Sequence, residues 1–268
     1  MDYGAMITDS FEYAKEALVG KWGRWMIFIL ISLPFALINF VFDPQKIIDK
    51  TTKTFHWELV HWDQIAILIV AGLLLMIFFA GYEVRIYRGI KPAPEFDNWK
   101  KLFIDGLKMS IVTLLWFLPI IATILAGLGI IFFDTEIAKG STGIVAVVSV
   151  ITMILMILLA FVFLIVFFLY AVLGSIRFAR TGSIREGIRF SKISEVIRTM
   201  GWLSYITALI VLVVLYAAFW IIRACLSIIP FVGWILIMII NPFFLILTDR
   251  YFTLVYEQGE IQQGAAVQ

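Results

Sequence analysis

Six long stretches without a charged side chain constrain this chain more than any other feature. They contain 18 to 31 residues each and run over 25–42, 65–82, 111–133, 143–173, 202–222 and 224–248. A helix needs about 20 apolar residues to cross the hydrocarbon core of a bilayer, and within lipid the backbone must satisfy its own hydrogen bonds. The sequence therefore predicts an all-α, polytopic membrane protein with six transmembrane helices.

The composition leaves little material for a water-soluble domain. Hydrophobic residues make up 62% of the chain and charged residues only 15%. The polar segments are shorter than about 30 residues, too short to bury a core of their own. We therefore expect a single integral membrane domain over residues 1–268, ending in a polar tail at 260–268.

The basic residues predict the orientation of the chain. Sixteen Lys and Arg residues fall before the first stretch, after every second stretch and in the tail, whereas five fall on the opposite side. Those five are Lys46, Lys50, Lys53, Lys139 and Arg223. Short loops rich in Lys and Arg stay in the cytoplasm. We expect a multi-pass protein of the plasma membrane with both termini cytoplasmic.

Two polar segments carry the same helical stripe of apolar side chains. The stripe follows the offsets i, i+3, i+7 and i+11, and a proline lies 23 residues after its first phenylalanine. The matching residues are Phe11, Ala14, Leu18, Trp22 and Pro34, and then Phe96, Trp99, Phe103, Leu107 and Pro119. A more degenerate third copy begins with the capping-box pattern Ser183-Ile184-Arg185-Glu186. The pattern predicts pseudo-repeats at about 9–89, 94–182 and 183–259, each an amphipathic interfacial helix followed by a two-span hairpin.

Paired arginines close the second and fourth stretches. Arg85 and Arg88 follow one, and Arg177 and Arg180 follow the other, with the same spacing of three. We interpret the four as candidate ligands of anionic lipid head groups; the alternative is that they only enforce topology. The aromatic residues expected to anchor the neighbouring helices in the membrane interface are Phe11, Trp22, Trp25, Phe96 and Trp99.

The sequence offers little chemistry for catalysis. His56 and His61 are five residues apart, unlike the four-residue spacing with which two helical histidines hold one metal ion. Glu83, Asp249 and Arg250 fall at the ends of uncharged stretches rather than within them. Because ion-coupled transport generally requires ionisable groups inside the membrane, an ion-coupled pump is disfavoured. We expect no catalytic residue, no metal site and no cofactor.

One segment resembles a known family. The run Gly81-Tyr-Glu-Val-Arg-Ile-Tyr-Arg-Gly89, followed by Pro92-Ala-Pro-Glu-Phe-Asp-Asn-Trp99, resembles an uncharacterised family of archaeal and bacterial membrane proteins classed as a domain of unknown function. The resemblance extends over nearly the whole chain and implies no activity. Physically, Pro92 and Pro94 interrupt one helix, and Glu95, Asp97 and Asn98 favour the N-terminal end of the next.

The favoured function is a non-enzymatic integral membrane protein that organises lipid or a membrane protein partner through its interfacial helices. The alternative is a transport-type protein that moves a lipid or a small amphipathic solute. The expected partners are membrane lipids and either a membrane protein or a second copy of this chain. No nucleic acid is expected.

Overall fold

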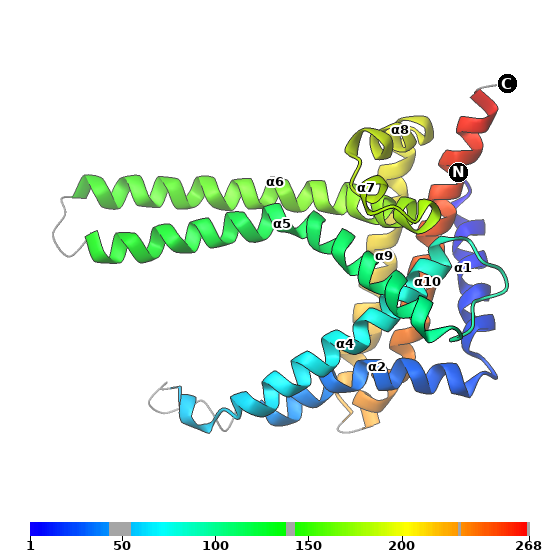
Figure 1. The fold of residues 1–268 in the computed structure, drawn as a ribbon, viewed down its shortest axis with the longest axis horizontal. Helices are drawn as coiled ribbons and strands as arrows, with labels where there is room; N and C mark the ends of the chain where they lie inside the picture. Colours follow the sequence, from blue (N-terminus) through cyan, green and yellow to red (C-terminus); the bar gives the residue numbers. More distant parts are fainter. Residues whose placement is uncertain (43–54, 138–142, 230–231, 267–268) are drawn as a thin grey trace. The chain divides into compact units, whose positions relative to one another are not determined.

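The computed structural model describes residues 1–42, 55–137, 143–229 and 232–266, and within these ranges the regular structure is helical without a strand. The helices are α1 (Tyr3–Leu18), α2 (Trp22–Val41), α4 (Trp62–Tyr87), α5 (Trp99–Ile137), α6 (Gly143–Thr181), α7 (Ile184–Gly187), α8 (Phe190–Met200), α9 (Trp202–Ser227) and α10 (Val232–Ala266), with a 3₁₀ turn at Trp57–Leu59 (Figure 1). Among the described residues, α4, α5, α6, α9 and α10 are long and apolar enough to cross a membrane. A sixth span results only if α1 and α2 form one bent span.

The chain divides into two compact units. Unit 1 comprises Met1–Leu107 and Ile197–Gln268, and unit 2 comprises Lys108–Val196. Unit 1 contains α1, α2, α4, α9 and α10, and unit 2 contains α6, α7 and most of α5.

At the first predicted junction the chain turns sharply between two helices. α1 ends at Leu18, Gly20 takes a positive φ of 76°, and α2 leaves at 96° to α1. Glycine adopts this backbone conformation without the penalty that a Cβ would bring. The sharp turn therefore separates α1 from α2 before Trp22, so the last residue of the predicted stripe belongs to α2.

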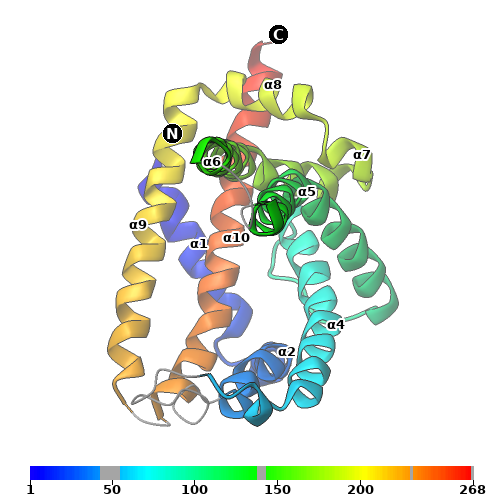
Figure 2. The same cartoon turned by 90° about the vertical axis from the view of Figure 1, so that its left-hand side faces the viewer.

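Much of the apolar face of α1 is covered by protein. α1 packs along α10, and Figure 2 shows α1, α9 and α10 running side by side. Ala14 and Leu18 of the predicted stripe are fully buried, whereas Phe11 and Trp22 remain exposed. Small side chains such as Ala14 and Ala17 allow two helices to approach closely within a membrane. Whether the exposed residues reach the membrane interface stays a prediction.

The core of unit 1 lies where α2, α4 and α10 meet. Phe28 of α2 makes edge-to-face contacts with Phe79 and Tyr82 of α4, at centroid distances of 5.9 and 5.1 Å. Ile246 and Leu247 of α10 belong to the same buried cluster. Such offset aromatic pairs add to the packing energy of the area that they bury.

The second predicted junction differs from the expectation. Residues 99 to 137 form one helix, so the stripe that begins at Phe96 does not form a helix separate from the following span. No glycine with positive φ and no proline interrupts residues 107 to 111, and the backbone can therefore continue its hydrogen bonding. The expectation of a separate amphipathic helix at this place is wrong.

The third predicted junction has different local chemistry. Ser183 precedes α7, but its side chain makes no capping hydrogen bond, and Glu186 pairs with Arg177 and Arg189. The expected capping box is therefore not formed, because Glu186 is engaged by two guanidinium groups. α8 supplies an amphipathic helix, with Ile193, Val196 and Ile197 buried on one face.

The last two spans end later than the uncharged stretches suggest. α9 continues past Arg223 to Ser227, and α10 continues past Asp249 and Arg250 to Ala266. A single arginine near a helix end can extend its side chain toward polar surroundings without breaking the helix. Asp249 and Arg250 are 6% and 2% exposed, so protein covers the end of the last uncharged stretch, and their position at a span end stays a prediction.

The orientation of the chain stays a prediction. Lys46, Lys50, Lys53 and Lys139, which carry most of the argument for the outward side, lie outside the described residues.

Candidate functional site

The segment from the end of α4 to the start of α5 is folded by local backbone constraints. Gly89 adopts a φ of 76° just after the C-terminus of α4, and its N–H donates to the Ile86 carbonyl at 2.8 Å. Asn98 adopts a φ of 43°, which asparagine tolerates better than most residues, and its Oδ1 accepts from the Lys101 N–H at 3.3 Å. Asn98 therefore caps α5 as expected, whereas Glu95 and Asp97 face arginines.

Arg24 of α2 fastens this segment to the bundle. Its Nε donates to Glu95 Oε2 at 2.7 Å, its Nη2 donates to Glu95 Oε1, and its Nη1 donates to the Ala17 carbonyl at 3.1 Å. This two-point grip matches the planar guanidinium to the carboxylate. The hydrogen bonds from Arg24 hold the pKa of the Glu95 carboxyl below its ordinary value of 4.5.

Arg85 and Arg88, two of the four predicted head-group ligands, already have carboxylate partners within unit 1. Arg85 Nη1 donates to Asp97 Oδ1 and to the Glu95 carbonyl, the latter at 2.6 Å, and its Nη2 donates to the Asp97 carbonyl at 2.7 Å. Arg88 Nη1 donates to Asp105 Oδ2 at 2.7 Å. Both arginines therefore tie the end of α4 to the segment that follows it.

A surface pocket of about 340 Å³ opens beside these arginines. Its charged lining consists of three cations and two carboxylates, and the remainder is Ile90, Pro94 and Asn98. The charged residues are Arg85, Arg88, Lys101, Glu95 and Asp97. Because Glu95 and Asp97 are engaged by arginines, the pocket presents an excess of positive charge through Lys101. We call this feature the basic pocket.

The predicted anchors near the basic pocket make protein contacts. Phe96 stacks on Tyr82 at 4.6 Å and on Trp99 at 5.9 Å. Trp25 donates its indole N–H to the Ile239 carbonyl at 2.7 Å. Phe96 therefore fixes the position of residues 81–99, which we call the signature segment, and Trp25 fixes the position of α2. The role of Phe96 and Trp25 as interfacial anchors stays a prediction.

Unit 2 has a related arrangement at the end of α6. Arg177 donates to Glu186 Oε2 from Nε at 3.1 Å and from Nη2 at 2.5 Å, and Arg189 donates to Glu186 Oε1 at 2.9 Å. Hydrogen bonds from Arg177 and Arg189 hold the pKa of the Glu186 carboxyl below its ordinary value of 4.5. Arg180, the fourth predicted head-group ligand, is half-buried. In each predicted arginine pair the first arginine, Arg85 or Arg177, therefore forms an ion pair with a carboxylate in the segment that follows its helix.

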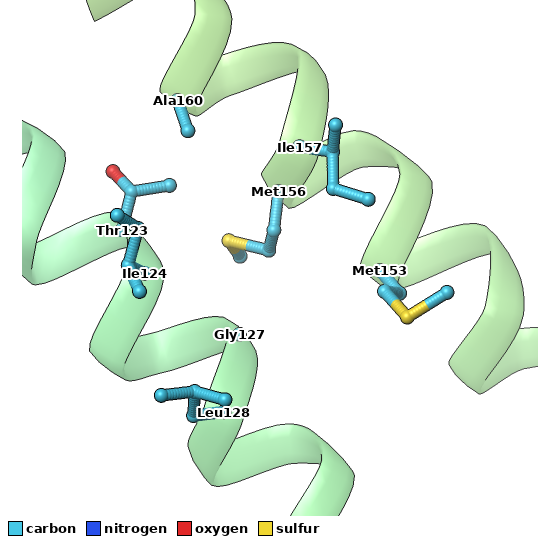
Figure 3. Close-up of a pocket in the computed structure, with 8 residues that line it drawn as sticks. All are labelled: Thr123, Ile124, Gly127, Leu128, Met153, Met156, Ile157 and Ala160. Carbon is cyan, nitrogen blue, oxygen red and sulfur yellow. The ribbon is translucent and has the colours of Figure 1, made fainter. Parts of the chain in front are cut away.

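A second pocket, in unit 2, is apolar. Figure 3 shows Thr123, Ile124, Gly127 and Leu128 of α5 facing Met153, Met156, Ile157 and Ala160 of α6 across a space of about 210 Å³. The Thr123 hydroxyl donates to the Pro119 carbonyl at 2.8 Å, so it is satisfied within its own helix. This pocket offers shape and apolar contact rather than chemistry.

The two histidines belong to a short aromatic segment. His56 Nδ1 lies 2.7 Å from Glu58 Oε1, and the rings of Trp57 and Trp62 stack at 5.9 Å. Within the part of the chain that the structure describes, no three side chains of His, Cys, Asp or Glu group together as metal ligands.

Sequence reasoning found the arginines but missed their partners. Arg24 and Glu95 are 71 residues apart, and Arg24 looks like one more cytoplasmic basic residue. A usable signal was present, since an acidic residue follows each arginine pair: Asp97 follows Arg85 by 12 residues, and Glu186 follows Arg177 by nine. Asp249 was missed because it borders a span in the sequence but is buried in the fold.

The chain belongs to the family described as "Protein of unknown function (DUF4013)", which matches residues 64–228. This range includes the signature segment, the basic pocket and all of unit 2. No curated protein and no solved structure matched the chain.

Proposed function

We propose that this chain is a non-enzymatic, multi-pass protein of the plasma membrane that organises anionic lipid at its cytoplasmic face, with both termini cytoplasmic. The observation that carries the proposal is the basic pocket, where Arg85, Arg88 and Lys101 line one surface hollow. A basic side chain near anionic lipid contributes about 1 kcal/mol of attraction. The pocket's position at the end of a span suits a head group whose acyl chains remain in the bilayer.

The ion pairs define what each cation contributes. Arg85 is held by Asp97, and Arg88 by Asp105, so both are preorganised and positioned by carboxylates. Lys101 is exposed on the first turn of α5 and adds charge that can move to meet a phosphate. Because the pocket's carboxylates are engaged as counter-ions, they serve poorly as general acids or bases. This favours binding over catalysis.

The sharpest test removes a pocket charge without breaking an ion pair. Lys101→Gln deletes the mobile cation, and Lys100→Gln is the matched control because Lys100 is a neighbouring exposed lysine that does not line the pocket. Loss of about 1 kcal/mol predicts about fivefold less phosphatidylglycerol retained per protein in the Lys101 variant. Native mass spectrometry after reconstitution with phosphatidylglycerol and phosphatidylcholine measures the retained lipid.

The Lys100→Gln variant and phosphatidylcholine, the neutral lipid, serve as the two controls. Lys100→Gln should retain phosphatidylglycerol like the parent, and phosphatidylcholine retention should be unchanged in both variants. Equal retention of phosphatidylglycerol by the two variants would remove the pocket from the proposal and leave the basic residues as topology determinants. Lysine substitution of Arg85 is a poorer test, since it would also disturb the bonds to Asp97.

A transport-type function remains the second candidate, and one observation favours it. Asp249 places a carboxylate in the core of unit 1 on a helix that is apolar enough to span the membrane. Ionisable groups at such positions are commonly functional in transporters. A membrane protein partner or a second copy of this chain could bind the exposed apolar helices in either case.

A further inference from the structure

Asp249 brings an incompletely satisfied carboxylate into the core of unit 1. The residue is 6% exposed and lies near the middle of α10. Its Oδ1 accepts a hydrogen bond from the Tyr87 hydroxyl at 3.0 Å, whereas its Oδ2 is buried without a hydrogen-bond partner. Leaving a charged oxygen buried and unpaired is costly, so the position calls for a positive charge or a proton.

A second carboxylate stands beside the first. Glu83 precedes Tyr87 by four residues on α4, so the two side chains share one face of that helix. This face packs on α10, where the Thr253 hydroxyl also reaches the Ile86 carbonyl at 3.4 Å. The packing of α4 on α10 thus places Glu83, which is half-buried, one helical turn from the tyrosine that bonds Asp249.

No basic side chain compensates this pair within the described ranges. The neighbouring Arg250 turns to α1, where its Nε donates to Asp9 at 2.9 Å and its guanidinium lies 5.2 Å from the ring centre of Tyr13. In the described chain neither Glu83 nor Asp249 forms an ion pair. The other titratable or charged groups that face the pair from α1, α4, α9 and α10 are Tyr13, Tyr82, Tyr87, Tyr216 and Arg250.

We propose that half-buried Glu83 and buried Asp249 form a proton-binding site that takes up one proton from water and holds it between the two carboxyl groups. Uptake changes the charge of the pair from two negative charges to one, which removes the mutual repulsion and gives the unpaired Oδ2 a partner. A proton suits the site better than a metal ion, because the described side chains supply two carboxylates rather than a shell of oxygen ligands. The site is independent of the basic pocket and would give a transport-type function an ionisable group.

Infrared spectroscopy of the purified full chain in lipid nanodiscs tests the site directly. At neutral pH and without sodium, the parent should show the carbonyl stretch of a protonated carboxylic acid, shifted in D₂O. Asp249→Asn and Glu83→Gln should each lose this band, because the proposed site holds the proton jointly between the two carboxyl groups. Asp63→Asn is the matched control: Asp63 is an exposed acid in the first turn of α4, and its variant should keep the band.

Every outcome decides the proposal. A parent without the band at neutral pH overturns it, whether or not the variants fold. A band that survives in both variants assigns the proton elsewhere, and loss in only one variant shows a proton held by a single residue. If sodium at neutral pH abolishes the parent's band, the site binds sodium and the proton assignment is wrong. Loss in both variants, with retention in the control and in sodium, supports the pair.

Discussion

Two groups of arginine–carboxylate ion pairs, which we call clamps, differ in their exposure to water. The clamp of unit 1, at the end of α4, consists of Arg24–Glu95 and Arg85–Asp97, and the clamp of unit 2, at the end of α6, consists of Glu186 with Arg177 and Arg189. In unit 1 the side chains of Arg24 and Arg85 are 5% and 10% exposed, while their partners Glu95 and Asp97 are 65% and 74% exposed. In unit 2 Arg177 and Glu186 are 20% and 22% exposed, and Glu186 has a second partner in Arg189. The two clamps use the same chemistry with unequal burial and unequal redundancy.

This difference predicts which clamp is indispensable. A buried guanidinium that loses its carboxylate remains charged in a poorly solvated place, which costs several kcal/mol. The Arg177–Glu186 pair, whose side chains are 20% and 22% exposed, is compensated in part by water when it is broken. Removal of the Glu95 carboxylate should therefore destabilise the protein more than removal of the Glu186 carboxylate.

The largest effect is expected where the two regions are most alike, at their glycines. A Cβ on Gly81 would lie 2.0 Å from the Leu102 carbonyl oxygen, and one on Gly174 would lie 2.3 Å from the Gly187 carbonyl oxygen. Because backbone atoms cannot move aside cheaply, Gly81→Ala and Gly174→Ala should each lower the free energy of unfolding by about 3 kcal/mol. Equilibrium unfolding in mixed micelles measures the change.

Two other glycines provide controls for these substitutions. Gly23 and Gly129 have no atom within 4 Å of the added Cβ, so alanine should leave stability unchanged or slightly higher there. If Gly174→Ala behaves like the controls while Gly81→Ala is severe, only the end of α4 depends on close helix approach. The structural parallel between the regions would then be broken.

The second-largest change in stability should differ between the two clamps. Glu95→Gln should destabilise the protein by about 2 kcal/mol, below the cost of a fully buried pair because the Glu95 carboxylate itself is exposed. Glu186→Gln should have a clearly smaller effect, and Glu12→Gln, at an exposed acid of α1, should have none. The same unfolding assay compares the three variants. Equal losses of stability in Glu95→Gln and Glu186→Gln would show that burial of the arginine does not determine how much each ion pair contributes.

Local patterns in the sequence were sufficient for part of this fold. Uncharged length located the apolar helices, and the helical stripe located α1 as far as Leu18. Asn98 was also placed correctly at the start of α5. Each of these features depends on residues within one or two helical turns of each other, where propensity and periodicity act directly.

The features that the sequence did not predict depend on distant contacts. The stripe from Phe96 to Leu107 resembles that of α1, yet no backbone signal separates it from the rest of α5. Arg24 and Glu95 are 71 residues apart in the sequence and Tyr87 and Asp249 are 162 apart, so each pair meets only through tertiary packing. Counting charges along the chain assigns Asp249 to a span end, and only packing shows that α1, α4 and α9 surround it.

The last expected effect is a pH dependence that both clamps should share. Hydrogen bonds from arginine lower the pKa of Glu95 and of Glu186 below 4.5 in the folded protein. Both contributions to stability are therefore complete above about pH 4.5 and are lost as the pH falls through the lowered folded values. Thermal unfolding against pH should show the parent and Glu95→Gln far apart at neutral pH and converging in acid, because protonated Glu95 resembles glutamine. Glu186→Gln should converge with the parent from a smaller initial gap. A gap between the parent and Glu95→Gln that stays constant into strong acid would mean that packing, rather than the charge on Glu95, fastens the signature segment.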